Sequence, residues 1–257
     1  MNAYVRIIPM LALAFVAGRG HCAEADAAAF AEAMKQVRRS DGFEARMNVS
    51  VFKADGQHLT TFKFAVIGQI GKDKQRVLIR GITPETVRAR YIAAERGADG
   101  RIRAIGYTNT ADAGTTRFDP GSGLFGSGVV LWDMFAPWWN WPRQEWVESR
   151  MSGTQGCSAI RSQSDGNAPV REVVSCIDRA GKLSLNTQLY GRQHKLLRSI
   201  AVERTMRKES GALAAKKLTI TEADGTVTEV EVYSGDENYL VTADTFAALD
   251  AQRGGEN

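Results

Sequence analysis

The sequence has few of the residues from which metal sites and polar active sites are usually built. Its 257 residues include three cysteines, three histidines and six prolines. It contains no Gly-rich phosphate loop, no G-x-S-x-G serine motif, no βαβ rhythm and no internal repeat. We therefore expect no enzyme and no cofactor.

Charge of one sign is also scarce. The 33 Lys and Arg residues nearly balance the 29 Asp and Glu residues, which leaves a net charge of +4, and no run of five or more basic residues occurs. A surplus this small does not predict a nucleic-acid partner. No apolar run beyond the N-terminus reaches the length of a membrane span.

The apolar run at the N-terminus has the pattern of a secretory signal peptide. Arg6 precedes the run IIPMLALAFV at 7–16, and small residues follow at Ala23 and Ala25. We predict that 1–25 is cleaved and that 26–257 is a single exported domain, periplasmic in a Gram-negative source. Cys22 could instead be a lipoprotein cysteine, but Arg19-Gly20-His21 lacks the small apolar residues that such a site requires.

Two cysteines remain after the leader, and an even number in an oxidising compartment favours a disulfide. A hairpin centred on Gly166 and Asn167 would place Cys157 opposite Cys176, within bonding reach. Two buried free thiols or a metal site are the alternatives. A zinc site would need a second pair of ligands nearby, and only His58 and His194 remain in the mature chain.

Apolar and polar residues alternate along most of the chain, which predicts an antiparallel meander of about ten or eleven strands. A helix is expected at 27–39, a long loop at 108–128, a short helix or strand at 129–135 and a helical turn at 245–251. The clearest strand candidates are 43–51, 59–67, 75–81, 87–95, 101–107, 145–151, 183–190, 196–206, 218–223 and 226–233.

All five tryptophans lie between residues 132 and 146. Each can bury roughly 150–250 Å², so the cluster must pack into a core, line a cavity or meet a membrane. Neighbouring residues on a strand point to opposite sides, and Pro137 and Pro142 prevent a regular helix. Some rings therefore serve as packing, and others are expected to face a cavity, a partner or lipid.

Polar clusters give weaker signals. His194 could pair with Asp178 or Asp165 and a serine, yet a lone histidine in such a context is usually a turn residue. Residues 236–238 read DEN but lack the alternating spacing of a calcium loop. We expect neither a catalytic nor a metal site.

The order of these segments resembles the outer-membrane lipoprotein-sorting protein family, the LolA/LolB-like periplasmic proteins. The likeness runs from about Phe43 to Phe246 and rests on FEARMNVSVF, KQRVLIRG, ITPETVRARYIAA, DGRIRAIGYTNT, VVLWDMF, GKLSLNTQLY and LTITEADGTVTEVEVYSGDENYLVTADTF. Members carry an aromatic and acidic helix where this chain has VVLWDMF. The density of tryptophan and the cysteine pair are departures that bear on the cargo.

The resemblance implies a mainly β (α+β) fold: an unclosed antiparallel β-barrel with an N-terminal helix, and helices and loops over its concave face. It implies a carrier that binds the acyl chains of a lipoprotein or lipid, with transient membrane contact and an inner-membrane transporter or exporter as a further candidate partner. The alternatives are an adaptor of the same fold and a secreted hydrolase. The expected lipid-binding residues are Met47, Val49, Phe62 and Phe64 on the strands, and Trp132, Met134, Phe135, Trp138, Trp139 and Trp141 above them.

Overall fold

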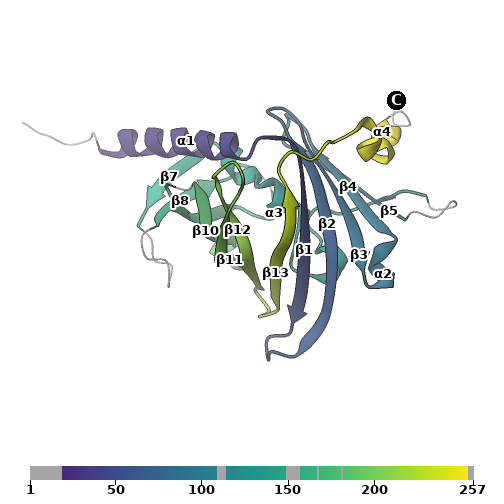
Figure 1. Cartoon of the computed structure of the whole chain (residues 1–257). Helices are drawn as coiled ribbons and strands as arrows, with labels where there is room; N and C mark the ends of the chain where they lie inside the picture. The colour runs from purple at the N-terminus through teal and green to yellow at the C-terminus, as the bar shows by residue number, and fades with distance from the viewer. Residues whose placement is uncertain (1–18, 109–113, 149–156, 167, 181, 254–257) are drawn as a thin grey trace, which may run out of the picture.

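The structure is a computed structural model that describes residues 19–108, 114–148, 157–166, 168–180 and 182–253 (Figure 1). The apolar run of the expected leader lies outside these ranges. Helix α1 spans Arg19–Val37, so it starts before the predicted residue 27 and includes the end of the expected leader. No helix in the described residues is long and apolar enough to cross a membrane.

The described strands form one thirteen-stranded antiparallel sheet in the order β6-β5-β4-β3-β2-β1-β13-β12-β11-β10-β9-β8-β7. Edge strands β6 and β7 do not pair with each other, so the predicted unclosed barrel is confirmed. The sequence predicted ten or eleven strands, fewer than the thirteen that the structure describes. One reason is that β6 has only two residues and lies in a stretch predicted as a loop. The strands are β1 (Ser40–Phe52), β2 (His58–Ile70), β3 (Gln75–Thr83), β4 (Arg90–Arg96), β5 (Ile102–Thr108), β6 (Thr116–Arg117), β7 (Arg143–Val147), β8 (Ser158–Gln163), β9 (Glu172–Asp178), β10 (Leu183–Tyr190), β11 (Leu196–Arg207), β12 (Leu213–Glu222) and β13 (Val227–Asp236).

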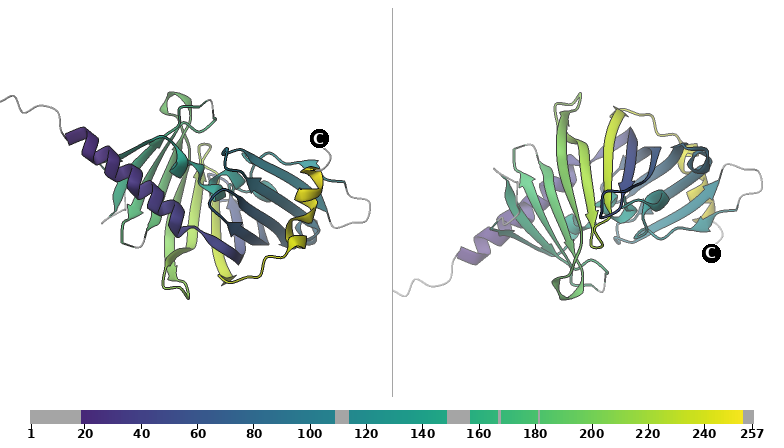
Figure 2. Two further views of the ribbon diagram at one scale, coloured as in Figure 1. Left: turned by 90° about the horizontal axis from the view of Figure 1, so that it is seen from above. Right: turned by 90° about the horizontal axis from the view of Figure 1, so that it is seen from below.

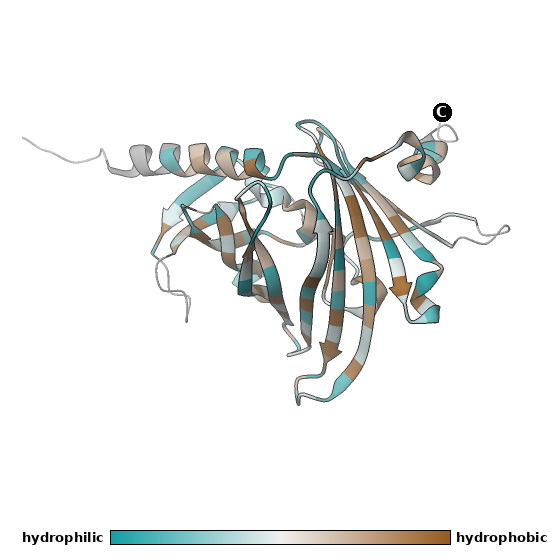
Figure 3. Ribbon diagram, viewed as in Figure 1, coloured by the Kyte–Doolittle hydropathy of each residue, from teal (hydrophilic) through white to brown (hydrophobic). Residues whose placement is uncertain are grey.

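Period-two alternation gives the sheet two distinct faces, and brown and teal bands alternate along its strands in Figure 3. On the inner face, Val49 of β1 lies opposite Phe62 of β2 and Val230 of β13. On the outer face, Ile67 and Leu78 pack beneath the C-terminal helix, with the rest of that cluster. Each face therefore requires its own cover.

The segment that covers the inner face joins the two edges of the sheet. It consists of η1 (Leu124–Gly126), α3 (Leu131–Phe135) and η2 (Pro137–Asn140), which follow β6 and precede β7. We call residues 124–141 the cover segment. Helix α1 packs on its second half and on β7, and lies across the β7–β10 half of the sheet in Figure 2.

The remaining helices are short. One prediction was wrong here: residues 85–88 form helix α2 (Glu85–Arg88), so Val87 does not belong to β4. Proline at 84 cannot donate a ladder hydrogen bond, and it stands directly before the helix as its N-cap. At the C-terminus, η4 (Ala243–Phe246) and α4 (Ala247–Arg253) confirm the expected helical turn.

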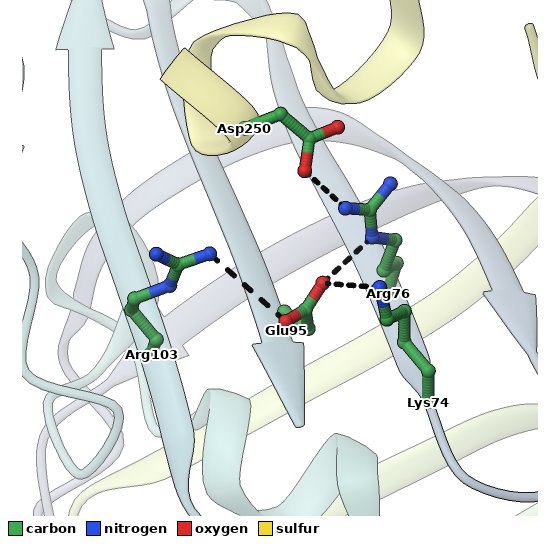
Figure 4. Close-up of polar contacts among 5 residues, drawn as sticks. All are labelled: Lys74, Arg76, Glu95, Arg103 and Asp250. Carbon is green, nitrogen blue, oxygen red and sulfur yellow. Dashed lines mark hydrogen bonds and ion pairs between the residues drawn. The ribbon is translucent and has the colours of Figure 1, made fainter. Parts of the chain in front are cut away.

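Helix α4 is held on the outer face by an ionic cluster (Figure 4). Glu95, with only 4% of its side chain exposed, lies 2.8 Å from Arg76 Nε, 3.7 Å from Lys74 Nζ and 4.0 Å from Arg103 Nη2. Arg76 also pairs with Asp250 of α4. The buried carboxylate is therefore compensated by several cations, as burial of a charge requires.

The two cysteines form the predicted disulfide, but the predicted register was wrong. Cys157 and Cys176 are bonded with their Cα atoms 5.5 Å apart. In the hairpin, Cys176 lies opposite Ala159, because the strands pair two residues further along than a turn centred on 166–167 would give. The disulfide is thus a diagonal link between neighbouring strands, which their spacing permits.

Candidate functional site

The first half of the cover segment packs on the inner face of β1 to β5. Leu124, Leu131 and Phe135 are buried with Phe62 and Phe64 in one apolar cluster. The Phe125 ring contacts both strand rings, with centroids 5.6 Å from that of Phe62 and 6.2 Å from that of Phe64. These contacts come from one face of each strand, which is why the alternation predicts them.

The second half of the cover segment packs beneath α1. Trp138 and Trp139 are 4% and 3% exposed, and they share an apolar cluster with Ala31 and Met34 of α1. The rings of Trp132 and Trp138 lie 5.6 Å apart, and those of Trp132 and Trp141 lie 6.0 Å apart. Trp138 also contacts Trp139, with centroids 6.3 Å apart, so four of the five tryptophans form one continuous aromatic group, whereas Trp146 contacts Phe30 of α1.

The ten expected lipid-binding residues all lie between the cover segment and the inner face, but in two clusters. Met47, Val49, Phe62, Phe64, Met134 and Phe135 belong to the first, and Trp132, Trp138, Trp139 and Trp141 to the second. Ile200 of β11 packs against both. Six of the ten are buried, and Met47, Trp132, Met134 and Trp141 are half-buried.

Side chains of the cover segment pack directly against the inner face of the sheet. Two cavities, of about 300 and 540 Å³, lie beside β7 to β10, and none of the ten residues lines either of them. The aromatic rings of the cover segment contact the apolar side chains of the inner face. A ligand that binds between the cover segment and the sheet would displace these packing contacts.

One buried ion pair links helix α3 of the cover segment to strand β11 of the sheet. Asp133 of α3 accepts hydrogen bonds from Arg198 Nε at 2.6 Å and Nη2 at 2.5 Å, and both side chains are largely buried. Burial raises the pKa of Asp133, while the hydrogen bonds from Arg198 act in the opposite direction. Glu222 lies nearby, and burial together with Asp224 raises its pKa as well.

A second arginine holds the C-terminal end of α3. Arg38 donates hydrogen bonds to the carbonyl oxygens of Met134 and Phe135, the latter at 2.9 Å. Burial and the neighbouring Arg96 lower the pKa of Arg38 to about 10. Carbonyls at a helix end lack partners within the helix, so this guanidinium satisfies them.

Other hydrogen bonds link the two halves of the cover segment to strands β13 and β7. Gly128 donates to Thr228 Oγ1 at 2.9 Å, and buried Gln144 donates to the carbonyls of Trp138 and Trp141. The indole Nε1 of Trp138 is buried and has no hydrogen-bond partner among the described residues. Within the part of the chain that the structure describes, this indole N–H is thus a buried unsatisfied donor inside the aromatic group.

Sequence reasoning found the aromatic residues of this site but not its polar anchors. Arg38 and Arg198 were not predicted, because nothing local marks an arginine whose partner lies far along the chain. Asp133 carried a signal, since a carboxylate within an aromatic run must find a cation if it is buried. Within the described ranges, no group of three or more His, Cys, Asp or Glu residues could hold a metal ion.

Comparison with known proteins identifies solved structures that have the same fold. Neither a protein-family model nor a curated protein sequence matches the chain. Solved structures do, each at low identity. A domain described as an outer membrane lipoprotein-sorting protein, from Vibrio parahaemolyticus, matches with a TM-score of 0.73 and 14% identity, covering 89% of this chain and 99% of that one.

Two further structures agree. A DUF1329 family protein from Desulfovibrio piger has a TM-score of 0.75 and 15% identity, over 87% of this chain and 96% of that one. A LolA superfamily protein from Nitrosomonas europaea has a TM-score of 0.63 and 13% identity, over 86% and 96%. The chain therefore has the LolA-like fold that the family resemblance implied.

Proposed function

We propose that this protein is a non-catalytic carrier of acyl chains, and that the chains of a lipoprotein or lipid bind between the cover segment and the inner face. The observation that carries this proposal is the cover itself. An aromatic-rich segment joins the two unpaired edges of an open sheet and lies over its apolar inner face. The structural neighbours described as lipoprotein-sorting and LolA superfamily proteins support it.

The physical task of such a carrier is to keep an apolar chain out of water. Each buried CH₂ group contributes about 0.8 kcal/mol, so an acyl chain can replace the ring contacts that hold the cover down. Half-buried Trp132, Met134 and Met47 mark where a chain would first enter. The unpartnered indole Nε1 of Trp138 would donate to the carbonyl oxygen of an acyl ester or amide.

We infer from the expected signal peptide that this transfer occurs in the periplasm and proceeds toward the outer membrane. A transporter or exporter in the inner membrane would then load the carrier. The position of the cover between the two sheet edges suits such loading, because the cover can move without breaking any strand pairing in the sheet.

Native mass spectrometry of protein purified from its own cell envelope tests this proposal. We expect adducts whose extracted mass is that of an acylated lipid, and uptake of a palmitoylated peptide by the delipidated protein. The same peptide without its acyl chain is the matched control and should not bind. Folded protein that carries no lipid and takes up neither peptide would refute the proposal.

A further inference from the structure

The outer face of strands β7 to β10 carries a cavity that the carrier function does not use. Its volume is about 540 Å³, and its floor includes the apolar side chains of Ala159 and Val174. Arg161, Glu172 and Tyr190 rise around this floor from β8, β9 and β10. Because side chains alternate between faces, these residues point away from Ile160 and Val173, which pack under the cover segment and α1.

Two polar atoms at this cavity lack hydrogen-bond partners among the described residues. Both Glu172 Oε1 and Arg161 Nε are buried without one. The other carboxylate oxygen, Oε2, accepts from Gln163 Nε2 at 3.0 Å and lies 3.7 Å from Arg161 Nε. His194 Nδ1 lies 3.3 Å from Glu172 Oε1, outside hydrogen-bonding geometry. A buried acceptor and a buried donor therefore stand side by side.

An aromatic pair forms one wall of the cavity. The Tyr190 and His194 rings are stacked, with centroids 4.2 Å apart and an interplanar angle of 4°. The Tyr190 hydroxyl donates to Gln188 Oε1 at 2.7 Å. Gln193 and His194 both have a φ of 55°, a left-handed conformation that residues with a side chain rarely adopt. The turn that contains Gln193 and His194 thus has a strained backbone, and the His194 imidazole packs on the Tyr190 ring.

The chemistry of these groups favours a neutral polyhydroxylated ligand. An anion would meet the carboxylates of Glu172 and Glu148, and a cation would meet the guanidinium of Arg161. A hydroxyl group both donates and accepts, so it can satisfy Glu172 Oε1 and Arg161 Nε together. The apolar floor and the exposed side of the imidazole suit the C–H face of a ring.

We propose that this cavity binds a saccharide ring, with hydroxyls paired to Glu172 and Arg161 and the ring set against His194. The proposed saccharide site lies on the opposite face of the sheet from the proposed acyl site. The proposal therefore does not depend on the carrier function. A free sugar and the headgroup of a glycolipid present the same ring, and both would be recognised in the same way.

Two-dimensional NMR titration of the full chain with glucose, galactose and N-acetylglucosamine tests the proposal. We expect at least one sugar to bind with a Kd on the order of millimolar, with shifts confined to strands β8 to β10 and the turn at His194. Octyl glucoside below its micelle concentration, followed through these same resonances and not through those of the cover segment, identifies the source of the sugar. Binding at this cavity that is tighter than that of methyl glucoside assigns a glycolipid, and equal binding assigns a free sugar.

Glu172→Gln should weaken sugar binding by about tenfold, since it removes a charged acceptor, and His194→Ala should weaken it independently. Glu145→Gln is the matched control, because Glu145 also pairs with Arg161, at 2.6 Å, but does not line the cavity. The proposal is overturned if no sugar shifts these resonances, if both glutamate variants behave alike, or if only choline or phosphate binds.

Discussion

At the scale of single residues, the Asp133–Arg198 pair is the contact that most directly seats the cover segment. Both side chains are mostly buried, at 8% and 13% exposure. Arg198→Ala leaves the Asp133 carboxylate buried without its cation, and we expect a loss of about 3–5 kcal/mol in the free energy of unfolding. Urea denaturation measures this loss.

The matched control is the exposed pair of Arg204 and Glu231, where Glu231→Gln should cost less than about 1 kcal/mol. A double variant, Asp133→Leu with Arg198→Met, should recover much of the lost stability, because an apolar replacement removes both desolvated charges. Equal effects of Arg198→Ala and Glu231→Gln would contradict the role given to the buried pair.

The raised pKa of Glu222 predicts how the stability of the fold changes with pH. Burial, then Asp224 and Asp133, raise its pKa above the usual 4.5, against the effect of Arg198. The folded state therefore holds this proton more firmly than the unfolded state, and stability falls as pH rises from about 4.5 through the raised value. Glu222→Gln removes this loss.

We expect Glu222→Gln to be more stable than the wild type at neutral pH and similar to it below the usual carboxyl pKa. Thermal unfolding of both proteins across that pH range measures the difference. A difference that does not change with pH, or a variant that is less stable at neutral pH, would show that the carboxylate is not disfavoured in the fold.

At the scale of elements, the disulfide links β9 to the residue preceding β8. It spans 19 residues of sequence, and a loop of this length predicts about 3 kcal/mol of stabilisation in the chain-entropy model. Replacing Cys157 and Cys176 by serine should lower the free energy of unfolding by that amount, measured in urea. Addition of a reductant should then destabilise the wild type but not the double variant.

The elements themselves were largely predictable, because alternation in β1, β2 and β3 records which face is buried. Three features were not. The Cys hairpin pairs two residues out of the expected register, α2 replaces part of an expected strand, and β6 is too short to leave a pattern. Turn geometry and distant contacts decide such cases, and neither can be read from local periodicity.

At the scale of the whole molecule, the order of strands determines what the cover can do. The first and last strands, β1 and β13, pair in the middle of the sheet, so the free edges belong to β6 and β7. The cover segment connects those two edges in sequence. The family resemblance predicted a cover over an open barrel, but periodicity alone gave neither the strand order nor the arginines that hold the cover.

The account rests on motion of the cover, and a reversible lock tests this most directly. A Cβ atom placed on Gly128 would lie 3.1 Å from Thr228 Oγ1, so Gly128→Cys with Thr228→Cys should form a disulfide between the cover segment and β13. We predict that the oxidised double variant binds a palmitoylated peptide at least about tenfold more weakly than the wild type.

Reduction should restore binding in the double variant, and the wild type under the same reductant controls for the loss of the native disulfide. The measurement is peptide affinity by fluorescence anisotropy in the oxidised and reduced states. Equal affinity with the cover locked and unlocked would contradict the claim that acyl chains bind beneath it.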